Sequence, residues 1–212
     1  MSLFQRRRRE KDAPLRLHIG CGQQAIQGWI NIDNQALPGV DRVLDVRRGL
    51  PFRGASAIFA EHFLEHIGIE EGLAFLKDCR RALADFGVLR ISTPNLDWVY
   101  ATHYPSWPSG SSEERLRDCF QLNQAFHGWG HQFLYNRSTL EVLLKAAGFA
   151  DVVFHSYGQS DIPDLNNIER HETYLDTQEL PHVLIAEASG EAREVPFPAE
   201  ILQNYRVNIG TR

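Results

Sequence analysis

Five short apolar runs within residues 14–92 constrain the fold most strongly. Each is bounded by turn-forming or charged residues, and they read PLRLHIG, GWINID, DRVLDV, ASAIFA and GVLRIS. Apolar runs of about four to eight residues, separated by connections, are typical of strands that are buried on both faces. The pattern therefore predicts an α/β fold built on a mostly parallel sheet.

One amphipathic helix is predicted among these strands, over residues 69–84. Its apolar residues recur at helical spacing, acidic residues open it, and Arg80 and Arg81 come late, which suits the helix dipole. We expect residues 85–87, Asp-Phe-Gly, to end this helix before the strand that contains VLRIS.

The composition changes after Pro94, where a stretch rich in aromatic residues and histidine runs to about residue 135. It is too long for a plain connection, so we interpret residues 94–135 as an inserted helical lid or substrate region. A capped helix is expected over residues 136–149, and strands over 150–158 and 182–188. Residues 190–212 are expected to form a C-terminal arm of a single domain, 1–212.

A glycine turn follows the first apolar run. Gly20-Cys21-Gly22 would let the backbone approach a ligand closely, and with Ala25 it fits Gly-x-Gly-x-x-Ala, a form of the dinucleotide fingerprint. The next acid, Asp33, comes only 13 positions after Gly20, whereas the ribose acid of that fingerprint comes about 20 further on. The spacing therefore argues against a nicotinamide dinucleotide.

Two acids end neighbouring predicted strands, Asp33 and Asp45. Ligands of open α/β sheets bind at the carboxyl ends of the strands. Asp33 would there accept hydrogen bonds from ribose hydroxyls, and Asp45 from an adenine amino group. The alternative is that both are loop acids that cap turns.

In order and spacing, a set of segments resembles the class I S-adenosylmethionine-dependent methyltransferases, in particular small bacterial predicted methyltransferases of the type-11 kind. These segments are LHIGCG, GWINID, DVRRGLPF, AEHFLEH, FGVLRISTPN and LLKAAGF, and the resemblance covers roughly residues 14–190. It implies a Rossmann-like, doubly wound, seven-stranded sheet with the last strand antiparallel, and a helical insertion after the fifth strand. It also implies S-adenosylmethionine as cofactor.

The resemblance assigns Gly20 and Gly22 to the glycine motif, Asp33 to the ribose and Asp45 to the adenine side. The full set expected to bind the cofactor is Gly20, Cys21, Gly22, Asp33, Asp45, Val46, Glu61 and His62. The chain departs from the family pattern because Gln24 replaces the usual third glycine. Only about seven residues separate Gly22 from the next strand, fewer than the ~10 of a crossover helix, so we expect about one helical turn there.

The segment EHFLEH contains His62-x-x-Glu65-His66, the spacing of an inverted zinc peptidase motif. A buried strand precedes it, so the motif would start at the strand's carboxyl end and enter a turn before Ile69 rather than lie inside a helix. We therefore expect no metal, with Glu61 and His62 lining the cofactor site. His66 is expected to be a hydrogen-bonded structural histidine.

Residues 126–135, FHGWGHQFLY, carry the candidate catalytic histidines His127 and His131. Gly128 and Gly130 disfavour a regular helix, and no nearby acid completes a metal-ligand set in the sequence. One interpretation is a glycine-bent loop that packs under the insertion. The other is a wall of the acceptor site, in which His127 or His131 orients or deprotonates the acceptor.

Bulk properties exclude several other classes of protein. The net charge of −5 argues against a dedicated nucleic-acid binder, and no apolar run approaches the ~20 residues of a membrane span. Three scattered cysteines predict reduced thiols and a cytoplasmic protein, and Arg6 to Arg9 are interpreted as a solvated terminal arm.

The sequence thus predicts an S-adenosylmethionine-dependent methyltransferase that acts on a small-molecule acceptor, without nucleic acid or membrane partners and with a homodimer left open. The alternatives are a non-catalytic S-adenosylmethionine-binding module and a zinc hydrolase that uses the His-x-x-Glu-His motif.

Overall fold

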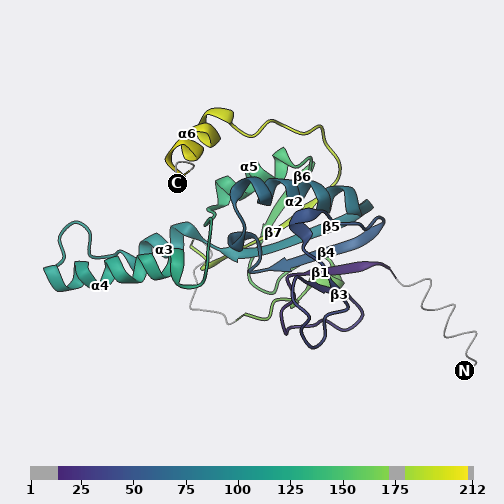
Figure 1. Ribbon diagram of the computed structural model, residues 1–212, viewed down its shortest axis with the longest axis horizontal. Helices are drawn as coiled ribbons and strands as arrows, with labels where there is room; N and C mark the ends of the chain where they lie inside the picture. The colour runs from purple at the N-terminus through teal and green to yellow at the C-terminus, as the bar shows by residue number, and fades with distance from the viewer. Residues whose placement is uncertain (1–13, 172–179, 210–212) are drawn as a thin grey trace, which may run out of the picture.

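The computed structural model describes residues 14–171 and 180–209, so the basic residues 6–9 lie outside the described part. Its sheet has seven strands in the order β3-β2-β1-β4-β5-β7-β6 (Figure 1). The strands are β1 (Arg16–Ile19), β2 (Ile30–Asp33), β3 (Arg42–Val43), β4 (Ala55–Glu61), β5 (Leu83–Pro94), β6 (Asp151–His155) and β7 (Val183–Ser189). Strands β1 to β5 pair in parallel, and β7 runs antiparallel to both β5 and β6. This confirms the predicted Rossmann-like sheet and its antiparallel last strand.

Helices cover one face of the sheet and extend beyond it (Figure 1). They are α2 (Ile69–Ala82), α3 (Leu96–His103), α4 (Ser112–Asn123), the π-helix η3 (Gln124–Gly128), α5 (Arg137–Ala146) and α6 (Ala199–Ile209). Three single 3-10 turns complete the set, η1 (Val46–Arg48), η2 (Leu64–His66) and η4 (Pro163–Leu165). None of the helices in the described residues is long and apolar enough to cross a bilayer, and the compartment of the protein stays a prediction.

The end of α2 differs from the sequence prediction. The helix ends at Ala82 rather than Ala84, and β5 begins at once with Leu83, which pairs with Ala55. The next pair is Ala57 with Val88, so the residues between Leu83 and Val88 form a bulge. The Asp-Phe-Gly stretch thus interrupts the strand instead of ending the helix, and Phe86 in it is 98% exposed.

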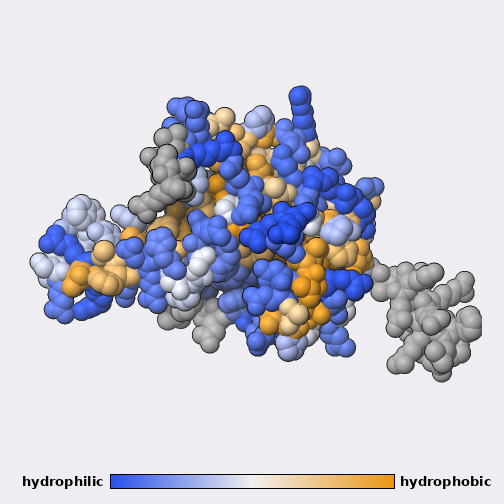
Figure 2. Space-filling view, viewed as in Figure 1, coloured by the Kyte–Doolittle hydropathy of each residue, from blue (hydrophilic) through white to orange (hydrophobic). Residues whose placement is uncertain are grey.

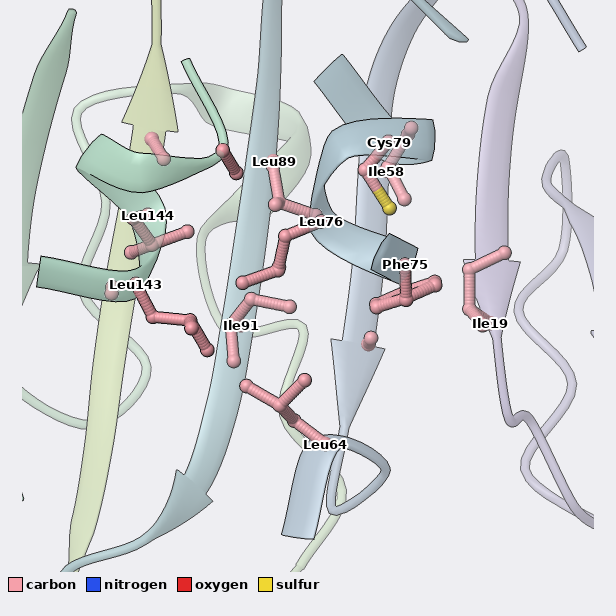
Figure 3. Close-up of a cluster of buried hydrophobic side chains, with 14 of the residues drawn as sticks. Ile19, Ile58, Leu64, Phe75, Leu76, Cys79, Leu89, Ile91, Leu143 and Leu144 are labelled. Atoms are coloured by element: carbon pink, nitrogen blue, oxygen red, sulfur yellow. The ribbon is translucent and has the colours of Figure 1, made fainter. Parts of the chain in front are cut away.

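The main core lies between the sheet and the helices α2 and α5. Figure 3 shows side chains of α2, such as Leu76, and of α5, such as Leu143, directed toward Leu89 and Ile91 of β5. All four are fully buried. Burial of one such side chain contributes about 1.5–3 kcal/mol, so this layer fixes the central strands.

The opposite face of the sheet is covered by loops. Phe59 of β4 points away from the main core, because side chains alternate along a strand, and it packs with Trp29 and Leu165. No helix connects β1 to β2, as the short spacing predicts, but the expected helical turn is absent, because residues 22–23 and 27–28 form only non-helical turns. This connection therefore leaves the carboxyl end of β1 without the usual helical cover.

Buried charges hold one of these loops on the sheet. Arg90 of β5 is fully buried, and its Nε donates to Glu169 Oε1 at 2.6 Å while its Nη1 donates to Glu187 Oε1 at 2.5 Å. Ser160 Oγ also donates to Glu187 Oε1 at 2.6 Å. Since Glu169 and Ser160 lie in the loop and Glu187 in β7, Arg90 joins residues 156–171 to the sheet.

The inserted segment forms a helical arm, defined here as α3 and α4. Figure 1 shows this arm projecting away from the sheet. At the base of the arm, Leu96 N, at the start of the inserted segment, donates to Tyr135 O, at its end, at 2.8 Å. A small core that includes Val99 and Leu134 fixes its base. Figure 2 shows an apolar patch on the arm among hydrophilic surface. Leu116 and Phe120 of α4 are 61% and 72% exposed.

The C-terminal residues return to the main core. Figure 1 shows α6 beyond α2 and α5, at the end of a long connection. Phe197, Leu202 and Tyr205 are partly buried against the core, and Lys77 Nζ pairs with Glu194 at 2.5 Å. The predicted arm therefore contacts the core through Phe197 and two side chains of α6.

Candidate active site

A cavity of about 800 Å³ opens where β1, β4 and β5 end. Ligand sites commonly have about 300–1,000 Å³, and this is the edge of an open α/β sheet where ligands bind. Six of the nine histidines of the chain line it. The lining residues are Gly20 to Gln24, Glu61, His62, His66, Pro94, Trp98, Val99, His103, Ala125, Trp129, His131, His171, His182 and Val183.

The glycine turn forms one wall of the cavity. Gly20 and Gly22 have φ angles of 64° and 51°, a conformation that favours glycine. A Cβ added at Gly20 would lie 2.8 Å from Cδ2 of Phe63, whereas one at Gly22 would meet no atom within 4 Å. Gly20 therefore permits close packing, and Gly22 leaves open space that a side chain would fill.

Asp33 supports this turn from behind. Its Oδ2 accepts a hydrogen bond from Gly22 N at 2.9 Å, and its Oδ1 accepts one from Gln35 N at 3.0 Å. Asp33 is not among the residues that line the cavity. In this structure it acts as a turn-capping acid, one of the two interpretations of the sequence, and it sets the position of a backbone group that lines the cavity.

Asp45 and Val46 also lie outside the lining. Asp45 caps η1 and binds Arg47, whose Nε and Nη2 donate to its carboxylate at 2.8 and 2.9 Å. The hydrogen bond from Arg47 holds the pKa of Asp45 below its usual range. The side chain of Val46 is buried in the main core. Only the backbone of Val46 could therefore contact a ligand.

Glu61 and His62 line the cavity at the end of β4. Glu61 accepts hydrogen bonds from the backbone N–H groups of Arg170 and His171, at 3.0 and 3.2 Å. Burial alone would raise the pKa of Glu61, but the hydrogen bonds from His171 and from the backbone hold it below its usual value. The same contact raises the pKa of His171.

His62 and Cys21 are the remaining expected cofactor residues. His62 has a φ of 46°, and its buried Nε2 has no hydrogen-bond partner among the described residues. Burial raises the pKa of Cys21 to about 11, so its thiol is neutral near pH 7 and contributes shape rather than charge.

The EHFLEH segment has the local structure predicted for it. Its first residue, Glu61, ends β4, and Leu64–His66 form the 3-10 turn η2 before α2 starts at Ile69. The two histidines of the motif therefore do not share one face of an α-helix. Glu65 between them is fully buried, and its Oε2 accepts a hydrogen bond from Thr93 Oγ1 at 3.0 Å.

The structure separates the two candidate catalytic histidines. His127 is exposed at the end of the π-helix η3, next to Phe126, and does not line the cavity. His131 lines the cavity, and its Nδ1 lies 2.6 Å from the carbonyl oxygen of Ala125. Burial lowers the pKa of His131, so its imidazole is neutral near pH 7.

One expectation about these motifs is corrected. An acid does lie close to His131, because Glu65, His66 and His131 offer ligand atoms that lie within 4.8 Å of one another. His66, expected to be a hydrogen-bonded structural histidine, lines the cavity beside His131, with ring centroids 5.1 Å apart. Sequence reasoning treated the two motifs separately because about 65 residues lie between them.

Other cavity residues were missed. Trp98 and His103 of α3 line it with His182, and the Trp98 ring lies 5.5 Å from His103 and 5.9 Å from His182. His171 completes the group, with its ring 4.0 Å from that of His62. The sequence offered one signal for these residues, namely that histidines such as His62 and His182 lie at or next to the ends of predicted strands.

Solved structures provide the comparison, since no protein-family model matches the chain and no curated protein matches its sequence. A SAM-dependent methyltransferase from Archaeoglobus fulgidus is 17% identical with a TM-score of 0.54, and the match covers 87% of this chain and 91% of that one. A DhpI–SAH complex is 16% identical, with a TM-score of 0.50 and coverage of 88% and 82%. The apo form of the S-adenosylmethionine-dependent methyltransferase SibL is 12% identical, with a TM-score of 0.51, and the match covers 85% of this chain and 51% of that one.

The fold of the chain is thus that of the class I S-adenosylmethionine-dependent methyltransferases. The strand order, the antiparallel β7 and the cavity at the carboxyl ends of β1 and β4 agree with this class. The comparisons give no support to a zinc hydrolase fold.

Proposed function

We propose that the protein is an S-adenosylmethionine-dependent methyltransferase that acts on a small-molecule acceptor. The observation that carries the proposal is the single cavity that joins the glycine turn to residues of the helical arm. Transfer of a methyl group between two bound molecules requires that the cofactor and the acceptor lie next to each other in one cavity. Two of the similar structures are S-adenosylmethionine-dependent methyltransferases, which supports the proposal.

The residues at the glycine end fit the cofactor. Gly22 leaves space beside a backbone that Asp33 orients, and the buried Nε2 of His62 has no partner within the described residues. Gly20, Cys21, Gly22, Glu61 and His62 would hold the cofactor directly, with Asp33, Asp45 and Val46 behind them. The group supplies an electrophilic methyl on a positively charged sulfur.

The arm end of the cavity is proposed to hold the acceptor. Trp98 and Trp129 offer flat apolar surfaces, and His131 offers a neutral imidazole. The carbonyl of Ala125 accepts the Nδ1 proton, so the lone pair of His131 is on Nε2. His131 would orient the acceptor or take its proton, and the exposed His127 would not.

Turnover to S-adenosylhomocysteine with a panel of hydroxyl, amine and aromatic acceptors tests this function. With an acceptor found, His131→Ala is expected to reduce kcat by about 10²- to 10⁴-fold, the usual contribution of a general base, and to leave the affinity for S-adenosylhomocysteine unchanged. His127→Ala is the matched control and should retain turnover. Equal loss in both variants would contradict the assignment of His131, and no turnover with any acceptor would favour a non-catalytic binding module.

A further inference from the structure

Two motifs that are far apart in the sequence meet at one point of the cavity. Glu65 and His66 follow β4, and His131 follows the π-helix η3. Their ligand atoms lie within 4.8 Å of one another, and the rings of His66 and His131 are 5.1 Å apart. The backbone N–H groups of Gln132 and Phe133 both donate to the carbonyl of Glu65, at 2.7 and 3.2 Å. The approach of the three side chains is therefore fixed by main-chain hydrogen bonds.

Glu65 is an incompletely compensated buried carboxylate. Its side chain has no exposed surface, and within residues 14–171 and 180–206 its Oε2 accepts only from the neutral Thr93 hydroxyl. His62 Nδ1 lies 3.0 Å from Oε1, but Oε1 has no partner in hydrogen-bond geometry among the described residues. No Lys or Arg in residues 14–171 and 180–206 forms an ion pair with Glu65. Buried carboxylates are normally paired with cations or bound to metals.

His131 is oriented as a metal-ligating histidine would be. Its Nδ1 faces the carbonyl oxygen of Ala125 at 2.6 Å, which fixes the proton on Nδ1 and the lone pair on Nε2. Histidine ligands of metals usually donate their second N–H to a carbonyl or carboxylate in this way. The hydrogen bond thus prepares Nε2 for a ligand in the cavity.

We propose that Glu65, His66 and His131 bind one divalent transition-metal ion of the Zn²⁺ type. Two imidazoles and one carboxylate are the ligand set of catalytic zinc and of related metals, and they leave a coordination position open. Mg²⁺ and Ca²⁺ prefer ligand sets made of oxygen. Because His66 and His131 line the cavity, the open position would face the space proposed for the acceptor.

This site is not the zinc peptidase motif. In that motif His62 and His66 would be ligands on one helix, whereas here His62 lies next to Glu65 and His131 supplies the second imidazole. Ligand atoms of a tetrahedral site with ~2.0 Å bonds lie about 3.3 Å apart. Since the ligand atoms lie within 4.8 Å of one another, their largest separation would shorten by up to about 1.5 Å on binding.

The role of the ion, but not its binding, rests on the proposed function. A metal in this place would bind an acceptor oxygen or nitrogen and favour loss of its proton. Metal ligation and base catalysis by His131 exclude each other because both use the lone pair on Nε2. Dependence of turnover on added metal would distinguish them.

The test is titration of the chelator-treated protein with Co²⁺, followed by visible absorption, and with Zn²⁺ by calorimetry. We expect one equivalent to bind, and His131→Ala and Glu65→Gln to weaken binding by at least about tenfold. His127→Ala is the control outside the cavity, and His103→Ala the control for another histidine that lines it. Both should bind the metal as the wild type does.

The outcomes are distinguishable from those of the proposed function. Failure of the wild type to bind a stoichiometric metal ion would overturn the site even if S-adenosylhomocysteine raises its melting temperature. Unchanged metal affinity in His131→Ala would also overturn it. If circular dichroism shows that Glu65→Gln does not fold, the metal affinity of His131→Ala is the deciding measurement, because His131 is only half-buried. Metal binding without binding of S-adenosylhomocysteine would support the site and contradict the proposed function.

Discussion

The carboxylate of Asp33 accepts a hydrogen bond from the backbone N–H of Gly22 at 2.9 Å, which joins the end of β2 to the turn that follows β1. The same carboxylate accepts from Gln35 N through its other oxygen. Asp33 therefore controls the position of the wall formed by the glycine turn, whether or not it also contacts a ligand.

Replacement of Asp33 tests this relationship. Asp33→Ala is expected to weaken the binding of S-adenosylhomocysteine by about ten- to a hundredfold, because a hydrogen bond to a charged group contributes about 1.5–3 kcal/mol. Asp33→Asn keeps one acceptor oxygen and should lose less affinity for S-adenosylhomocysteine than Asp33→Ala. Calorimetry measures both affinities, and an unchanged affinity in Asp33→Ala would contradict the position of the cofactor end.

The two glycines of the turn should respond differently to the same substitution. Gly20→Ala places a Cβ 2.8 Å from Phe63, in addition to the strain of a positive φ. Gly22→Ala has that strain alone, since its Cβ would meet no atom within 4 Å. We expect Gly20→Ala to lower the melting temperature more, and Gly22→Ala to lose ligand affinity while remaining folded. The reverse order would show that the open space at Gly22 is not used.

Arg90 should be the most sensitive position of the loop-covered face. Arg90→Met would leave the buried carboxylates of Glu169 and Glu187 without their cation. Loss of one partner of a buried ion pair costs about 3–5 kcal/mol in the free energy of unfolding. Urea unfolding measures this cost, with Glu169→Gln as the comparison that keeps Arg90 paired with Glu187. A change below about 1 kcal/mol would contradict the role of this network.

The pair formed by Glu61 and His171 makes stability depend on pH. The pKa of His171 is raised from the usual 6.5, first by its hydrogen bond to Glu61, so its contribution is complete below pH 6.5 and is lost as the pH rises through the raised value. The pKa of Glu61 is lowered from 4.5, so its contribution is lost as the pH falls below that value.

The melting temperatures of the wild type and His171→Ala should accordingly differ most near about pH 5.5 and less near about pH 8. Thermal unfolding at both values is the measurement. A difference that does not change with pH would show that His171 contributes by packing against His62 alone.

The sequence predicted the layout of the sheet because the relevant signals are local. The run that contains Leu17 and Ile19 places apolar residues at alternate positions and ends in turn residues, and both residues are fully buried. The missing crossover helix after Gly22 was predictable from a simple count of residues. The end of α2 was not, because the pairing of Leu83 with Ala55 involves a bulge that no local pattern indicates.

The candidate site was only partly predictable. Gly20 and Gly22 were found because two glycines directly after an apolar run indicate a turn with positive φ angles. The meeting of Glu65 with His131 was missed, because it depends on how the inserted segment returns to the sheet. The sequence left Asp45 between an adenine contact and a turn cap, and the structure shows the capping contact, with Arg47 bound two positions later.

Calorimetric titration of the purified protein with S-adenosylhomocysteine tests the central claim most directly. The account predicts saturable binding of one molecule per chain, and a ligand concentration of 100 times the dissociation constant should add about 2.7 kcal/mol to the free energy of unfolding. Gly22→Val should abolish this binding, since a branched side chain would enter the open space at Gly22. Absence of saturable binding by the wild type, or equal binding by Gly22→Val, would contradict the account.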